Sequence, residues 1–163
     1  MDLTATHTFD HPIETVWAMF CDRDSHVAKF EGMGHRDIEV LDFTDDSGDV
    51  LIKISRVVDV DLPGFAKKVL KPSSTVESTD HWHDNGDGTY GGTFTADAKG
   101  QPVEVRGTTM LTPDGDRTQY EVTTSVKVRV PIIGGKIEKW AKGDIDRQMK
   151  AEFDAGDAWL AAH

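Results

Sequence analysis

The sequence contains a single cysteine, Cys21, among its 163 residues, so it cannot form an internal disulfide. Its first residues, MDLTATHTFDHP, have no basic segment followed by an apolar stretch and therefore do not resemble a secretory signal. No apolar run approaches the roughly 18 residues that a membrane-spanning helix needs. These absences argue against a disulfide-stabilised secreted scaffold and against a helical membrane protein, and they predict a cytoplasmic location.

Basic residues are scarce beside acidic ones: 18 Lys and Arg against 29 Asp and Glu give a net charge of −11. General nucleic-acid binding needs a basic surface, so a nucleic-acid partner is not expected. A large charge of one sign favours a soluble protein that is a monomer or a weak dimer. The length fits one domain over residues 1–163, and a hydrophobic fraction of 37% that includes four Trp and seven Phe can form a folded core.

Apolar and polar residues alternate in the first strand candidate, Leu3 to Phe9, and in most of the chain from residue 36 onwards. The sequences TDDSG, DNGDG, AKGQ and PDGD separate most of these alternating segments and have the composition of hairpin turns. Seven antiparallel strands are therefore predicted. After the first, they are RDIEVLDF, DVLIKISRVVDV, STVESTDHWHD, TYGGTFTADA, PVEVRGTTMLT and RTQYEVTTSVKVRV.

Three segments have helical spacing instead. FDHPIETVWAMF, in which Pro12 suits a first helical turn, and CDRDSHVAKFEGMG predict two short helices after the first strand. The C-terminal segment carries an apolar stripe that predicts a helix of about 28 residues, roughly 42 Å long. Pro131 ends the strand before it, and Gly134-Gly135 permits a sharp turn into the helix. The predicted fold class is α+β, a seven-stranded antiparallel sheet wrapped around the long C-terminal helix.

Two local patterns accompany this order of elements. The first is a strand that ends in an apolar residue, followed by proline, an acid and a Val-Trp pair: Phe9, Pro12, Glu14, Val16 and Trp17. The second is VPIIGGKIEKW, which opens the C-terminal helix, with HW at 81–82 and QPVEV at 101–105. Together they resemble the START-like superfamily (SRPBCC, helix-grip), which includes the birch pollen allergen, and within it an uncharacterised bacterial branch. The resemblance implies a helix-grip fold whose hydrophobic cavity, between sheet and helix, often holds a lipid or polyketide-like ligand.

Strand parity indicates which side chains face the interior, because alternate residues of a strand point to opposite faces. This parity places Arg56 and Asp80 inside, where a charge is costly unless it is paired. The two are predicted either to form a structural ion pair or to be the polar anchor of a ligand pocket. Asp144 and Gln148, on the inner helix face, are further polar candidates. The predicted ligand-binding residues are Ile54, Arg56, Asp80, Tyr90, Phe94, Val105, Val122, Trp140, Asp144, Ile145 and Gln148.

Two patterns that could indicate phosphate or metal binding are interpreted structurally. Gly134-Gly135 opens a helix, but it lacks the spacing of a P-loop or of a dinucleotide-binding motif, so the pair is predicted to be a hinge. His81 and His83 share one strand face, but no pattern supplies a third ligand, and no metal site is predicted.

The link DLPGFAKKVLKP combines apolar residues with Lys67, Lys68 and Lys71. One interpretation is a short helix that caps the sheet edge. The other is a portal lid at residues 62–71 whose basic side makes a transient contact with anionic lipid or a membrane. With a net charge of −11, such attraction is expected to be weak and salt-sensitive.

No Ser-His-Asp order, thiol-base pair or cofactor motif occurs, so neither a catalytic residue nor a cofactor is predicted. The leading hypothesis is a protein that binds or carries a hydrophobic or amphipathic small molecule. The second is an enzyme of the cyclase, dehydratase or isomerase type, using groups such as Arg56, Asp80, Tyr90 or Asp144. The third is a protein-interaction module similar to co-chaperone relatives. An occupied cavity favours the first, convergent acid-base groups the second and a filled core the third.

Overall fold

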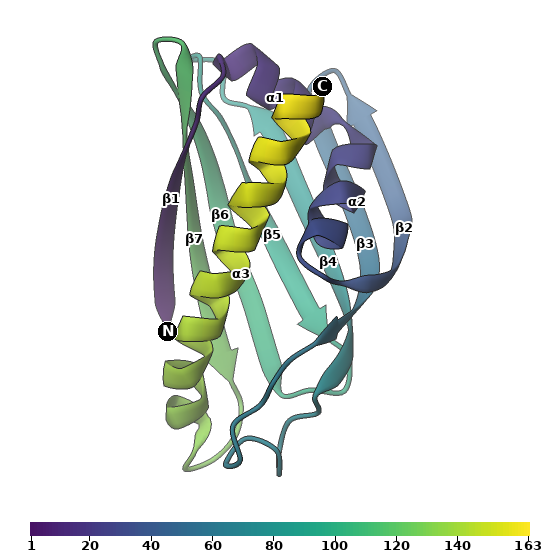
Figure 1. The fold of residues 1–163 in the computed structure, drawn as a ribbon, viewed down its shortest axis with the longest axis vertical. Coiled ribbons are helices and arrows are strands. Elements are labelled where there is room, and N and C mark those ends of the chain that lie inside the picture. The colour runs from purple at the N-terminus through teal and green to yellow at the C-terminus, as the bar shows by residue number, and fades with distance from the viewer.

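The computed structural model describes all 163 residues and contains one seven-stranded antiparallel sheet and three helices (Figure 1). The strands are β1 (Asp2–Phe9), β2 (Arg36–Asp46), β3 (Asp49–Asp59), β4 (Ser73–Asp84), β5 (Tyr90–Ala98), β6 (Val103–Asp114) and β7 (Arg117–Val128). The helices are α1 (Ile13–Cys21), α2 (Arg23–Gly32) and α3 (Gly134–Ala162). The strand order is β1-β7-β6-β5-β4-β3-β2. The α+β helix-grip class predicted from the sequence is confirmed.

The helices cover one face of the sheet. Figure 1 shows α3 crossing this face, with α1 and α2 beside its C-terminal half. The chain enters α1 at Pro12, whose carbonyl accepts the first helical bonds, from the amides of Thr15 and Val16. Between the two short helices, the Asp22 carboxylate accepts a hydrogen bond from the backbone amide of Asp24 at 2.8 Å and so caps α2.

Of the two adjacent glycines at the start of α3, Gly134 and Gly135, only the first is required by the packing around it. A side chain at Gly134 would place its Cβ 2.8 Å from the carbonyl oxygen of Val128, so the close approach of helix and strand requires glycine there. Gly135 has open space around it. Two residues before Gly134, Ile132 has a φ of 73° and a fully exposed side chain, an unusual conformation for a β-branched residue.

The hydrophobic core has a main part at the α1 end of the molecule and a second part at the opposite end. The main part combines aliphatic side chains with aromatic ones, among them Phe9, Phe20, Trp82 and Tyr120. At the other end, Leu62 and Ala66 of the β3–β4 link pack on β7 and on the first turn of α3. β7 contributes Val126 and Val128 to this part of the core, and α3 contributes Ile137. The link forms consecutive turns rather than the short helix that one interpretation of its sequence predicted.

His26 on α2 belongs to this interior as a neutral side chain. Its exposed fraction is 2%, and its Nε2 lies 2.8 Å from the carbonyl oxygen of Phe20. Burial and, to a smaller extent, the nearby charge of Lys29 lower the pKa of His26 to about 4. Since an unfolded histidine has a pKa near 6.5, the stabilisation is complete above that pH and is lost as the pH falls from 6.5 towards 4.

We expect His26→Gln, which keeps a donor for the Phe20 carbonyl, to weaken the dependence of stability on pH. Between about pH 7 and pH 5, the free energy of unfolding of the variant should fall by about 2 kcal/mol less than that of the wild type. Urea denaturation at the two pH values measures this difference. His83→Ala, which removes an exposed histidine, is the control and should leave the pH dependence unchanged. Equal pH dependence in His26→Gln and wild type would show that His26 is not the titrating group.

Candidate ligand-binding cavity

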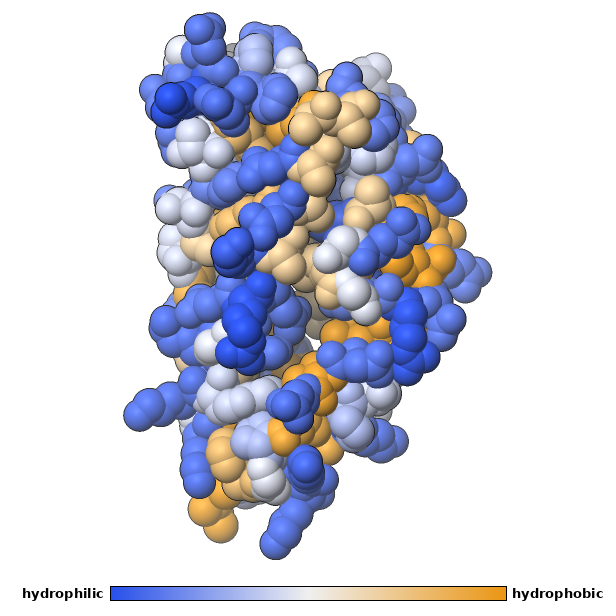
Figure 2. All heavy atoms as spheres, viewed as in Figure 1, coloured by the Kyte–Doolittle hydropathy of each residue, from blue (hydrophilic) through white to orange (hydrophobic).

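A cavity of about 290 Å³ lies between the sheet and α3 and is lined by 34 residues, of which 21 are hydrophobic. It reaches from the α2 side of the molecule to the β3–β4 link, which contributes Val60, Leu62 and Leu70. Figure 2 shows hydrophobic atoms gathered along this link, next to α3. A concave, largely apolar site with a few polar groups is typical of small-molecule binding.

Small side chains on the inner faces of β4 and β5 account for the open volume. Parity brings Ser74 and Ser78 of β4 and Ala96 and Ala98 of β5 to the cavity wall. These strands are neighbours, and Ser78 pairs directly with Ala96. Because none of the four fills the space beneath α3, a cavity lies where the main core would otherwise continue.

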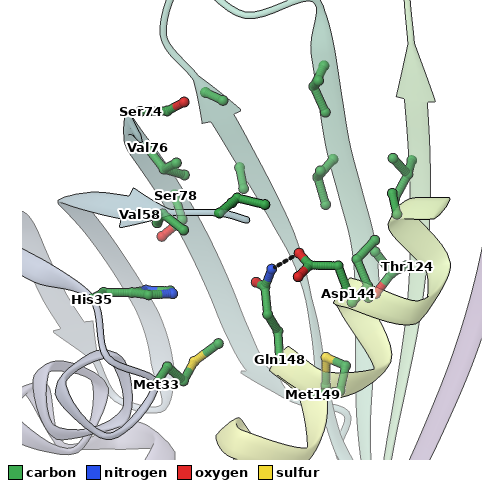
Figure 3. Close-up of a pocket in the computed structure, with 18 of the residues that line it drawn as sticks. Met33, His35, Val58, Ser74, Val76, Ser78, Thr124, Asp144, Gln148 and Met149 are labelled. Carbon is green, nitrogen blue, oxygen red and sulfur yellow. Dashed lines mark hydrogen bonds between the residues drawn. The ribbon is translucent and has the colours of Figure 1, made fainter. Parts of the chain in front are cut away.

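The α3 wall supplies two polar side chains. In Figure 3, Asp144 and Gln148 point from the helix into the cavity, joined by a hydrogen bond. The Gln148 amide donates to the Asp144 carboxylate at 2.6 Å. Asp144 also accepts a bond from Arg147 at 3.2 Å, an ion pair one helical turn apart. The carboxylate is therefore already engaged by two donors of its own helix.

Arg56 of β3 is the most deeply buried cation on the cavity wall, with an exposed fraction of 7%. Its Nε donates to Nδ1 of His35 at 3.1 Å, and its Nη1 donates to the Ser78 hydroxyl at 2.8 Å. The guanidinium also lies over the Phe30 ring, 3.8 Å from its centroid. Burial lowers the pKa of Arg56 to about 10, against the opposing influence of nearby carboxylates, so the side chain stays charged at neutral pH.

His35 is neutral in this arrangement. Burial, followed by the charges of Arg56 and Lys29, lowers the pKa of His35 to about 4. Because Nδ1 accepts the bond from Arg56, the ring proton is on Nε2. Figure 3 shows the His35 ring pointing into the cavity from the side opposite Gln148.

A second charged group lies beside Arg56. Lys29 of α2 bridges two carboxylates, with its Nζ 3.8 Å from Asp80 and 3.7 Å from Glu152. Next to them, Tyr120 is buried, and burial is the main reason that its pKa lies well above the usual value. All four side chains line the cavity, and the positive charge of Lys29 is already balanced by its two partners.

The direct ion pair between Arg56 and Asp80 suggested by strand parity is not formed. Both residues face inward as predicted, but in the register of β3 and β4 Arg56 pairs with Val76, whereas Asp80 pairs with Ile52. The two positions are thus four residues apart along the strand direction, about 13 Å at the backbone. Lys29 reaches Asp80 instead.

Of the eleven residues predicted to bind a ligand, the structure brings nine to the cavity wall. They are Arg56, Asp80, Phe94, Val105, Val122, Trp140, Asp144, Ile145 and Gln148. Their role in ligand binding stays a prediction, because the structure places them without showing a ligand.

Ile54 and Tyr90 do not line the cavity. Ile54 faces inward, but it packs in a small cluster with Phe30 of α2, which separates it from the open volume. Tyr90 stacks on Trp17 of α1, with ring centroids 4.3 Å apart, at the filled end of the molecule. In both cases a helix of the N-terminal pair covers a strand position whose inward direction was predicted correctly.

Several polar residues of the cavity were not predicted from the sequence, among them Lys29, His35 and Glu152. Glu152 could have been found, because it continues the four-residue spacing of Asp144 and Gln148 along the same helix face. Lys29 and His35 carry no such signal. They reach the cavity because α2 packs beside α3, an arrangement that the periodicity of either helix does not specify.

The two strand histidines lie away from the cavity. His81 forms a side-chain bond to Asp49 of the neighbouring strand, and His83 is exposed. No group of three or more His, Cys, Asp or Glu side chains is arranged to hold a metal ion.

Comparisons with known proteins agree with this geometry at the level of the fold. The model of a family described as "Protein of unknown function (DUF2505)" matches residues 4–160. No curated protein matches the chain. Among solved structures, TTHA0849 from Thermus thermophilus is similar with a TM-score of 0.67 at 14% identity, over 99% of this chain and 98% of the other.

Two further similar structures carry more informative names. A START superfamily protein from Mycobacterium smegmatis has a TM-score of 0.56 at 13% identity, over 97% of this chain and 98% of its own. Norcoclaurine synthase from Thalictrum flavum has a TM-score of 0.57 at 13% identity, over 100% of this chain and 87% of its own. At these identities the likeness shows the fold alone, and it confirms the START-like fold that the sequence patterns resembled.

Proposed function

This chain belongs to the DUF2505 family, and we propose that it binds or carries a hydrophobic or amphipathic small molecule, such as a lipid or a polyketide-like compound. The observation that supports this most is the cavity of about 290 Å³ under α3, with 21 hydrophobic residues among the 34 in its wall. An empty apolar cavity of this size lowers the stability of a folded core, and a bound apolar ligand would restore the missing packing contacts. The cavity occupies the space between sheet and helix that the resemblance to the START-like superfamily implies.

The experiment that tests this proposal uses an uncharged fluorescent probe, N-phenyl-1-naphthylamine. Titration into the delipidated protein should give a saturable rise in fluorescence with one probe bound per chain. An uncharged long-chain alcohol should displace it. Absence of saturable binding by the folded protein would contradict the proposal.

The alternative of a cyclase, dehydratase or isomerase receives less support from the geometry. Among the groups suggested for acid-base work, Tyr90 lies outside the cavity, and Asp80 and Asp144 are held by Lys29, Arg147 and Gln148. A co-chaperone-like interaction module would not need the cavity. Binding without chemical transformation therefore remains the leading proposal.

The surface supports the expectations for location and assembly. No helix is long and apolar enough to cross a membrane. Among large hydrophobic side chains, only Leu41, Met110 and Ile132 are exposed. Such scattered apolar exposure, together with the net charge of −11, fits a monomer or a weak dimer. The lone cysteine, which cannot form an internal disulfide, supports the proposal of a cytoplasmic protein.

The link at residues 62–71 is proposed to be a portal that makes transient contact with an anionic membrane. It borders the cavity, and its lysines Lys67 and Lys68 are exposed. The loop that carries the exposed Ile132 lies at the same end of the molecule (Figure 1), and Lys136 just after it sits over the Phe65 ring at 4.2 Å. An apolar tip surrounded by lysines suits an interface with negatively charged headgroups.

We expect the double variant Lys67→Glu/Lys68→Glu and the single variant Ile132→Asp to lose association with vesicles that contain phosphatidylserine. Each lysine near such a surface contributes about 1 kcal/mol. Vesicle sedimentation at low salt measures the bound fraction. Leu41→Asp, which changes an exposed apolar residue of β2, is the control and should bind as the wild type does. If all the variants sediment equally, the contact is made elsewhere or not at all.

A further inference from the structure

Arg56 is a buried cation without an anionic partner. No carboxylate oxygen lies within 4.0 Å of its guanidinium, and its two side-chain acceptors, His35 and Ser78, are both neutral. The nearest carboxylates, Asp80 and Glu152, contact Lys29 and not Arg56. All direct contacts of this buried charge are with neutral groups and the Phe30 ring, so an anion bound beside it would reduce the cost of its burial.

The free hydrogen-bonding capacity of Arg56 faces the cavity. Nε and Nη1 donate to protein acceptors, which leaves Nη2 without one. Every fully buried polar side-chain atom of the protein has a hydrogen-bond partner. Because Nη2 has none, it is not fully buried and borders open volume, and Arg56 is part of the cavity wall. His35 presents a second possible donor, its Nε2–H, from the same side. An acceptor bound here would meet donors on the guanidinium and the imidazole.

We propose that the ligand of this cavity is an amphiphile with a single carboxylate, bound at Arg56, and an apolar tail. The tail would lie along the inner faces of β5, β6 and β7, where Val105, Val122 and Val126 line the wall. This inference rests on the proposed function and specifies its ligand class. A carboxylate can form a charge-assisted contact with the free edge of the Arg56 guanidinium, whereas a doubly charged phosphate would bring a second negative charge near Asp80 and Glu152.

Laurate and lauryl alcohol differ only in the head group, so their competition against N-phenyl-1-naphthylamine tests the proposal. At pH 7.5, below the micellar concentration of laurate and the solubility limit of the alcohol, the wild type should bind laurate about 10–100-fold more tightly, as expected for one charge-assisted hydrogen-bonded contact. Methyl laurate, which keeps the ester oxygens without the charge, should compete like the alcohol. Equal affinities for the acid and the alcohol in the wild type would overturn the proposal without any variant.

Substitutions then assign the preference to Arg56. Arg56→Gln should bind laurate no more tightly than the alcohol, and Arg56→Lys should keep only part of the preference, because an ammonium lacks the planar fork. The exposed Arg36→Gln, which breaks only surface contacts with Asp37 and Asp59, is the matched control. A preference that survives in Arg56→Gln would assign the carboxylate to another residue. If the wild type binds neither probe nor alcohol, the proposed function itself fails, which is distinct from failure of the carboxylate preference.

Discussion

Replacing Ala96 by tryptophan is expected to abolish binding of the neutral probe while the protein stays folded. Ala96 points inward from the middle of β5, between Ser78 of β4 and Val105 of β6, and lines the cavity. An indole at this position enters the open volume instead of a packed core, so the usual penalty for overpacking, about 1–3 kcal/mol, should be small or absent. Filling the cavity removes the apolar surface available to a ligand and should raise the melting temperature slightly.

The matched control for this variant is Thr95→Trp. Thr95 neighbours Ala96 on β5 but is exposed on the other face, so the same side chain is added outside the cavity. It should bind the probe with the affinity of the wild type. Circular dichroism and thermal melts establish that both variants fold. Undiminished probe binding by a folded Ala96→Trp would place the binding site somewhere other than under α3.

Replacing Trp82 by alanine is expected to lower the free energy of unfolding by about 3–5 kcal/mol. The Trp82 side chain is 2% exposed and stacks on Phe20 with ring centroids 4.4 Å apart. It also lies beside Trp17 and Tyr120, at centroid distances of 6.2 Å each. Removing the indole leaves a hole among these rings, which belong to the filled core and cannot collapse without moving α1.

Urea denaturation at neutral pH measures this loss. His83→Ala, which shortens the next residue of β4 on the exposed face, is the control and should change stability by less than about 0.5 kcal/mol. A Trp82→Ala variant as stable as the control would mean that the aromatic cluster does not hold α1 on the sheet. If Trp82→Ala loses stability but still binds the probe at low temperature, the result would agree with the position of Trp82 outside the cavity wall.

Alternation along the strands, together with the helical stripe of the C-terminal segment, predicted the sheet, the long helix and nine of the 34 residues in the cavity wall. The side chains of Val105, Val122 and Phe94 reach the cavity because a strand in a half-buried sheet has only two faces, and one of them is apolar. The same rule placed Arg56 inward, against the general expectation for a charged residue. For α3, the apolar stripe identified Trp140 and Ile145 in the same way.

The position of a residue along its strand could not be predicted in this way. Parity gives the face but not the register with the next strand, so Arg56 and Asp80 share a face without meeting. Parity also does not say which helix covers an inward residue. Ile54 lies under Phe30 and Tyr90 lies against Trp17, because the link between β1 and β2 folds as two helices over one end of the sheet. On β4 and β5, beneath α3, small residues leave the cavity open.

Native mass spectrometry tests the central claim, that the cavity binds a small hydrophobic or amphipathic molecule, most directly. The delipidated wild type and Ala96→Trp are each incubated with a lipid extract of the expression host, and excess lipid is then removed. The wild type should show a second population whose added mass corresponds to one small amphiphile, released on collisional activation, and Ala96→Trp should show only the bare chain. A wild type that carries no added mass, or an added mass shared equally by Ala96→Trp, would contradict binding in the cavity.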